Sequence, residues 1–160
     1  MKKTALLFSL FCLIDFAYAQ PSKDKTAQAL QTKQVVEVFL DRLANKDIDH
    51  IASSFAEHVD WYIFESPKFP WTGRRTKRSE IPEVFKTLFS YFVDGKEKFQ
   101  LDSLIVDGND AAIFAELGRQ FKNSGKDFTM YIAIHFKVEN GFITKFYLYE
   151  QTPILEKAYE

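Results

Sequence analysis

The 160-residue sequence contains a single cysteine, Cys12, and only three histidines. One thiol closes no disulfide within the chain, and scattered histidines without carboxylates at ligand spacing form no metal motif. The sequence also lacks a glycine-rich phosphate loop and the Gly-x-Ser-x-Gly pattern of a nucleophile elbow. We therefore expect no metal, no cofactor and no hydrolase built on a catalytic triad.

Neither sign of charge dominates, since 21 Lys and Arg residues stand against 22 Asp and Glu residues. Domains that bind nucleic acid carry an excess of basic residues on one face, so we expect no nucleic-acid partner. A basic run at residues 73–78 matches no phosphate motif. We interpret it as a solvated loop, with an anion site before a helix as the alternative.

Only the N-terminus carries a long apolar run, at residues 5–14. Two lysines at positions 2 and 3 precede it and Ala17-Tyr18-Ala19 follows it, which is the pattern of a secretory signal peptide. A buried N-terminal helix, the alternative, explains neither feature. We predict export to the periplasm or the medium, with no stable membrane anchor because the run is too short to span a bilayer comfortably.

The chain is expected to have three parts: a signal peptide at 1–19, a polar segment at 20–32 and one domain at 33–160. The first half of the polar segment is interpreted as a tether and the second half as the approach to a helix. A chain of this length forms one domain with a real core. Seventeen phenylalanines indicate that this core has aromatic walls.

Residues 131–152 predict a hairpin of two long strands joined at Asn140-Gly141. Asn-Gly favours this turn because both turn positions adopt positive φ. Alternation places three residues of the second strand on the apolar face: Phe142, Phe146 and Leu148. The opposite face carries four ring side chains: Tyr131, His135, Tyr147 and Tyr149.

Apolar residues at helical spacing predict a long helix over residues 35–43, a short helix through residue 55 that Asp47 caps, and a third helix from Ser79 toward Gly95. Period-two alternation predicts further strands at 59–64, 98–106, 111–121 and 128–138, and a short helix closes the chain at 153–159. Proline and glycine predict a loop at 65–76. This order predicts an α+β fold, a cone-shaped curved antiparallel β-sheet wrapped around a long N-terminal helix and two further helices.

Three motifs point to a known fold: V-V-E-V-F-L-D-R-L-A-N-K-D-I-D-H-I-A-S-S-F-A-E-H-V-D-W at 35–61, P-W-T-G-R at 70–74 and H-F-K-V-E-N-G-F-I-T-K-F at 135–146. With the order of elements, they make the chain resemble the nuclear transport factor 2-like superfamily, in its SnoaL-like and ketosteroid-isomerase-related branch. The resemblance implies a cystatin-like α+β barrel with a pocket. It implies no single reaction, since the family includes isomerases, cyclases, dehydratases, hydrolases and non-enzymatic binders.

Ketosteroid isomerases use a tyrosine on the first helix, an aspartate base on the first strand and a protonated aspartate on a later strand. Aligned on the shared motifs, these positions hold Phe39, Ile63 and Ile134 in this chain. None of the three supplies a base or an oxyanion donor. We therefore exclude ketosteroid isomerisation by that mechanism.

The same alignment turns one set of side chains inward. The resemblance, together with the aromatic residues of the loop at 65–76, indicates seven ligand-binding residues: Trp61, Ile63, Trp71, Arg119, Ile134, Phe146 and Leu148. Glu150 is a candidate catalytic acid or base. In one interpretation Arg119 and Glu150 contact a polar group of an apolar ligand; in the other they form a salt bridge that only closes the rim of the barrel. Phe69 and Trp71 are interpreted either as a lid or as a loop pinned to the core.

We expect an exported protein that binds a small hydrophobic molecule, and whether it is an enzyme stays open. The alternative is a non-catalytic interaction module of the same fold. A homodimer is expected through the outer face of the last strands, which carries Tyr131, His135 and Tyr147, because that face is unusually aromatic for a solvated surface.

Overall fold

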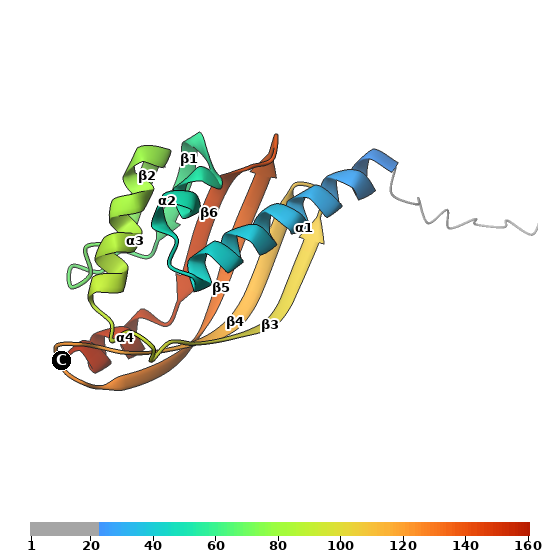
Figure 1. The fold of residues 1–160 in the computed structure, drawn as a ribbon. Helices are drawn as coiled ribbons and strands as arrows, with labels where there is room; N and C mark the ends of the chain where they lie inside the picture. The colour runs from blue at the N-terminus through green and yellow to red at the C-terminus, as the bar shows by residue number, and fades with distance from the viewer. Residues whose placement is uncertain (1–22) are drawn as a thin grey trace, which may run out of the picture.

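In the computed structural model, which describes residues 23–160, four α-helices lie on one six-stranded sheet (Figure 1). The helices are α1 (Lys23–Ala44), α2 (Ile48–Ser53), α3 (Ile81–Ser90) and α4 (Thr152–Tyr159). The strands are β1 (Phe55–Ile63), β2 (Gly73–Lys77), β3 (Lys98–Asp107), β4 (Asp110–Gln120), β5 (Asp127–Glu139) and β6 (Phe142–Glu150). The predicted α+β class is confirmed; the predicted signal peptide and its cleavage site lie outside the described residues.

The strand order is β2-β1-β6-β5-β4-β3, and one pairing in it departs from the antiparallel sheet that we predicted. β1 runs parallel to β6, with Trp61 opposite Phe146 and Ile63 opposite Leu148. All other neighbouring strands are antiparallel. Consecutive strands joined by short turns pair antiparallel, whereas the long connection between β1 and β6 imposes no such direction.

The predicted loop at 65–76 contains most of an edge strand, β2, so that expectation is wrong for residues 73–76. Gly73 pairs with Ile63, and Arg74 pairs with Tyr62. A short, charged strand is typical of a sheet edge, where side chains face water on both sides. It therefore shows none of the apolar alternation by which strands are detected in a sequence.

The hairpin between β5 and β6 has the predicted turn, since Asn140 and Gly141 adopt φ of 53° and 78°. The face predicted for Phe142 is wrong: its side chain is 43% exposed, and Ile143 is buried instead. The register between the strands shifts at this point, because Val138 pairs with Ile143 while Lys137 pairs with Lys145. A bulge of this kind reverses the alternation on its far side.

Helix α1 begins at Lys23, so the stretch interpreted as a tether is helical in its described part. Polar contacts hold this half of the helix to the β3–β4 turn. The Thr32 hydroxyl is fully buried and donates to the Gly108 carbonyl at 2.8 Å, and Lys25 Nζ lies 2.8 Å from Asp107 Oδ1. Because these contacts are polar, the segment carries no apolar stripe that would predict a packed helix.

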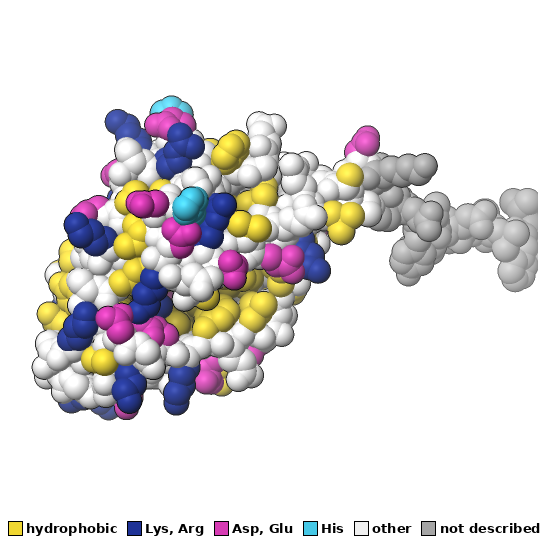
Figure 2. Space-filling view, in the orientation of Figure 1, with side chains coloured by type: hydrophobic (Ala, Val, Ile, Leu, Met, Phe, Trp, Pro, Cys, Tyr) yellow, Lys and Arg dark blue, Asp and Glu magenta, His cyan; other side chains and the backbone are white. Residues whose placement is uncertain are grey.

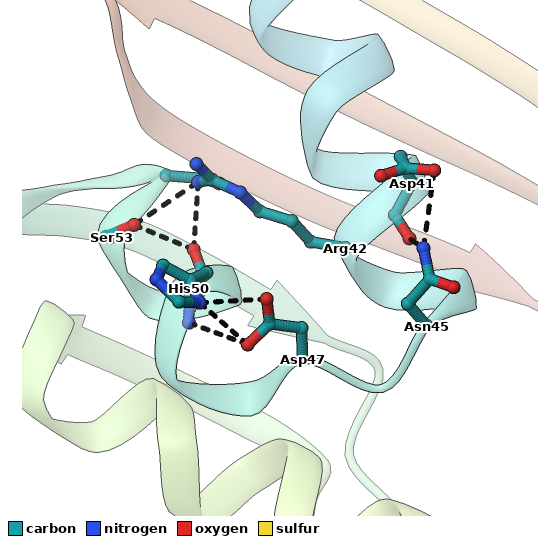
Figure 3. A network of polar contacts seen from close by, with 7 residues as sticks. Asp41, Arg42, Asn45, Asp47, His50 and Ser53 are labelled. Carbon is teal, nitrogen blue, oxygen red and sulfur yellow. Dashed lines mark hydrogen bonds and ion pairs between the residues drawn. The ribbon is translucent and has the colours of Figure 1, made fainter.

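The junction between α1 and α2 is tied by polar side chains (Figure 3). Asp47 caps α2 as predicted, accepting from the His50 amide at 3.4 Å, and the bond from the His50 ring lowers the pKa of the Asp47 carboxyl. Arg42 donates to the His50 carbonyl at 2.9 Å and to the Ser53 hydroxyl at 3.2 Å. The short helix predicted through residue 55 ends earlier, at Ser53, because Phe55 already begins β1 and is buried.

Aromatic side chains fill the space between the helices and the sheet. Phe39 of α1 is fully buried, with its ring centroid 5.6 Å from Phe55 and from Phe136 and 5.8 Å from Phe146. At the α4 end a second cluster holds Phe69 and Trp71, each 1% exposed, with stacked rings 4.7 Å apart. Their burial supports the interpretation of a pinned loop over that of a lid.

Candidate functional site

A cavity of about 400 Å³ lies between α1, α3 and the concave face of the sheet. Its walls are mainly apolar, and the helices contribute Leu40, Leu43, Val84, Phe85, Leu88 and Phe89. Figure 2 shows hydrophobic side chains gathered in the hollow that lies below α1 in that view, with charged side chains beside it. This size and lining are typical of a pocket for a small organic molecule.

All eight residues that we predicted for the site line this one cavity: Trp61, Ile63, Trp71, Arg119, Ile134, Phe146, Leu148 and Glu150. The strand register explains why. Ile63, Leu148 and Ile134 lie side by side on three neighbouring strands, and Trp61 stacks on Phe146 with ring centroids 4.1 Å apart. That these residues bind a ligand stays a prediction.

Two charged lining residues were not predicted, Lys46 and Glu97. Lys46 sits in the α1–α2 turn with φ of 54°, and its ammonium group pairs with Glu97 and with Asp94 Oδ1, the latter at 2.5 Å. These pairs raise the pKa of Lys46. The sequence holds no signal for them, because the turn and the loop before β3 are distant in the chain and neither carries a motif.

The side chain of Arg119, on β4, forms no hydrogen bond or ion pair with any residue of the described chain, 23–160, and its Nη1 atom is buried without a partner. The guanidinium group lies over two rings, 5.1 Å from the centroid of Phe92 and 5.8 Å from that of Phe89. Burial lowers the pKa of Arg119, against a smaller opposing effect from Glu97. A guanidinium nevertheless keeps its charge in a protein, so the cavity contains a cation.

Glu150 ends β6 and is also without a partner among the described residues, with Oε1 buried. Burial raises the pKa of this carboxyl from 4.5 to about 7. The salt bridge with Arg119 that one interpretation proposed is not formed. In the sheet, Arg119 of β4 lies opposite Phe128 of β5, and Glu150 of β6 lies opposite Ile132 of β5. Arg119 and Glu150 are therefore offset by four residues of β5, about 13 Å along the strand direction.

Trp61 adds a third unpartnered polar atom, because its indole nitrogen is buried without an acceptor. A fourth buried atom without a hydrogen bond, Glu97 Oε1, is not unpaired, since it forms the ion pair with Lys46. Each buried polar group left unpaired costs about 1–3 kcal/mol. Such groups are few in native proteins, and they gather at sites where a ligand completes their contacts. Here one apolar cavity contains an unpaired indole N–H, guanidinium and carboxyl group.

The positions of the isomerase residues are apolar in three dimensions as well. Ile63 and Ile134 line the cavity, and Phe39 lies in the aromatic core. Among the described residues, the titratable side chains lining the cavity are Lys46, Glu97, Arg119 and Glu150. Proton transfer in this cavity would therefore fall to Glu150, whose pKa near 7 suits both the acid and the base role.

Within residues 23–160, no three His, Cys, Asp or Glu side chains come together in a way that could hold a metal ion. The helices of this part include none that is both long enough and apolar enough to cross a membrane.

Comparison with solved structures shows the same fold in several proteins. A nuclear transport factor 2-like protein of Burkholderia thailandensis is 22% identical and superimposes with a TM-score of 0.71, covering 81% of this chain and 97% of its own. Bal32a, from a soil-derived mobile gene cassette, is 15% identical with a TM-score of 0.71, covering 83% and 99%. TerC, co-crystallised with polyporic acid, is 15% identical with a TM-score of 0.70, covering 81% and 98%.

No curated protein matches the chain. The model of one protein family, the SnoaL-like domain, matches residues 36–146, which spans every element from α1 to β6 in whole or in part. The fold is shared with nuclear transport factor 2-like proteins, and the chain belongs to the SnoaL-like domain family.

Proposed function

We propose that this protein binds a small, largely apolar molecule in the cavity between α1, α3 and the sheet. The observation that carries the proposal is the set of three unpartnered polar atoms, on Trp61, Arg119 and Glu150, in a cavity whose other walls are mainly apolar. A ligand with matching polar atoms would satisfy them while its body fills the apolar space. TerC, a protein of the same fold, was co-crystallised with polyporic acid, which adds support.

Tryptophan fluorescence tests this function directly, because the chain has two tryptophans and both line the cavity. We expect some members of a panel of aromatic molecules, from the hydrocarbons biphenyl and anthracene to 2-naphthol and 2-naphthamide, to change the emission and to raise the melting temperature with concentration. The variant Trp71→Phe leaves Trp61 as the sole reporter.

Filling the cavity provides the control. Val84 of α3 is buried and lines it, so Val84→Phe should weaken binding of every ligand found, whereas Lys86→Phe, on an exposed position of the same helix, should not. Binding that survives Val84→Phe unchanged, or a panel that leaves fluorescence and melting temperature unaltered, would contradict the proposed site.

Export is part of the proposed function, with the mature chain beginning at Gln20. The support is the two N-terminal lysines, the apolar run and Ala17-Tyr18-Ala19. Expressed in a bacterium, the protein should be recovered from the periplasm or the medium with the intact mass of residues 20–160. Full-length protein in the cytosol would contradict this.

A homodimer is the second candidate, favoured by an aromatic patch on the outer face of the sheet. Phe114, Ala133 and Tyr149 are paired neighbours on β4, β5 and β6, and Tyr131 lies two residues from Ala133. Tyr131 is 63% exposed. By contrast His135 and Tyr147 already contact Asp110 and Asp60 within the chain, at 2.8 Å each.

Light scattering tests the dimer. We expect twice the mass of the mature chain at micromolar concentration, and the mass of a monomer for Tyr131→Glu, because a buried glutamate without a partner disfavours the interface. If the unmodified protein is a monomer at high concentration, the dimer proposal fails, and cavity binding is unaffected.

A further inference from the structure

We propose that the ligand of the cavity is an organic anion: an apolar body with one ionised acidic oxygen group, such as a carboxylate or an enolate, which pairs with Arg119. This inference rests on the proposed function, since it specifies the chemical class of the molecule bound there.

The balance of charge in the cavity is the first step. Lys46 and Glu97 neutralise each other, and Lys46 also holds Asp94, whose side chain is 76% exposed. Two lining charges then stay without a direct partner, those of Arg119 and Glu150. Glu97 acts on Arg119 only at longer range, because no hydrogen bond or ion pair joins them in the described chain.

The two groups differ in what they can do without a ligand. A carboxyl group in an apolar site takes up a proton and becomes neutral, and burial moves the pKa of Glu150 in that direction. A guanidinium group cannot lose its proton at any ordinary pH. The cavity therefore has one charge that only a ligand can neutralise, and that charge is positive.

The setting of Arg119 suits an oxygen anion. The rings of Phe89 and Phe92 lie against the guanidinium and restrict its orientation, while its N–H groups have no acceptor in the described residues. A planar guanidinium donates two parallel hydrogen bonds to a carboxylate. An ammonium ligand, the opposite choice, would pair with Glu150 but would share a mainly apolar cavity with an uncompensated arginine.

The positions of the two polar groups give the ligand an orientation. Arg119 and Glu150 are offset by about 13 Å along the strands, so they approach different parts of one cavity. The acidic group of the ligand would lie at Arg119, near the start of β3. Its apolar body would then extend between the helices and the sheet toward Trp61 and the protonated carboxyl of Glu150.

Matched pairs of probes test the inference on the mature protein. We would measure benzoate against benzamide, 2-naphthoate against 2-naphthamide, and anthracene-9-carboxylate against its amide, at pH 6. In each pair the shape is nearly constant and only the charge changes. We expect the best carboxylate to bind about 30-fold more tightly than its amide, the effect of a charge-assisted bidentate contact.

Arginine variants assign that preference to its source. Arg119→Met should remove the preference for the carboxylate while amide binding persists. Arg119→Lys, which keeps the charge but not the planar fork, should retain only part of it. Arg74→Met, at an exposed arginine outside the cavity, should change neither affinity.

The pH dependence gives an independent readout that does not require loss of Arg119. Lys46, Glu97 and Arg119, the other charged groups of the lining, keep their charges between pH 6 and 8.5, while Glu150 ionises. Carboxylate binding should weaken above pH 7 by up to about tenfold in all, because ionised Glu150 then repels an anion held about 13 Å away at Arg119. In Glu150→Gln the affinity for carboxylates should no longer change with pH. The affinity for amides should change much less with pH, both in the unmodified protein and in Glu150→Gln.

The outcomes separate this inference from the proposed function. Equal affinity within each pair, or tighter binding of the amide, overturns the anion proposal and leaves a small-molecule site in place. A preference for carboxylates that survives Arg119→Met and Arg119→Lys also overturns it. If no carboxylate, amide or neutral hydrocarbon binds, the proposed function fails, and this inference fails with it.

Discussion

Phe39→Ala is expected to lower the free energy of unfolding by about 3–5 kcal/mol, which is a large part of the total stability of an ordinary domain. Phe39 is 0% exposed, and its ring meets those of Phe55, Phe85, Phe136 and Phe146 at centroid distances of 5.6–6.3 Å. Removing it leaves a void at the point where α1 packs on the sheet. Urea unfolding of the mature chain, followed by circular dichroism, measures the loss.

Phe64→Ala is the matched control for this result. Phe64 is 61% exposed and lies outside both the cavity and the patch proposed for the dimer, so the same change should cost about 1 kcal/mol or less. Equal losses for Phe39→Ala and Phe64→Ala would mean that the aromatic cluster is not the core.

Phe39→Tyr is also informative, because it introduces the hydroxyl that ketosteroid isomerases have at this position. With no acceptor prepared for it, that hydroxyl should cost about 1–3 kcal/mol.

Glu150→Gln is expected to stabilise the unliganded protein above pH 7, by at most about 3 kcal/mol. Burial raises the pKa of Glu150 from 4.5 to about 7, so over this interval the folded protein holds a proton that the unfolded chain has released. Stability therefore falls as the pH rises from 4.5 to 7 and is level above 7. Glutamine has no charge to desolvate, so the variant should lose this fall.

Denaturant unfolding at pH 5 and pH 8 measures the effect, with Glu116→Gln as the control on the same sheet but outside the cavity. A salt bridge between Glu150 and Arg119 would give the opposite result, since glutamine would then leave the arginine uncompensated. Adding Arg119→Met to Glu150→Gln should give nearly additive changes, because the two groups are not in contact. Destabilisation by Glu150→Gln at pH 8 would refute the arrangement described for this cavity.

Seven of the eight residues predicted for the site lie on regular strands, and Trp71, in the loop before β2, is the exception. Alternation puts Trp61 and Ile63 on one face of β1, and Phe146, Leu148 and Glu150 on one face of β6, while the resemblance to the family indicated that these faces look inward. The Asn140-Gly141 turn is equally local, since both positions need positive φ and these residues tolerate it.

Features that depend on distant contacts could not be predicted in the same way. The bulge after Ile143 exposes Phe142, yet nothing in the sequence marks where the register shifts. The first half of α1 is held by the buried bond from Thr32 to Gly108, across 76 residues of chain. Lys46 and Glu97 meet only because two loops come together at one end of the cavity.

The parallel pairing of β1 with β6 has a consequence for the order in which the chain folds. β1 is synthesised first of the six strands, but its neighbour β6 is the last; the Tyr147 hydroxyl that donates to Asp60 is 87 residues away in sequence. Until β6 is present, the β1–β2 pair has no link to β5, β4 and β3 within the sheet, and one edge of β1 stays open to other strands. Contacts this distant in sequence slow folding, and a chain that stops before β6 holds two separate halves of a sheet rather than a smaller version of the domain.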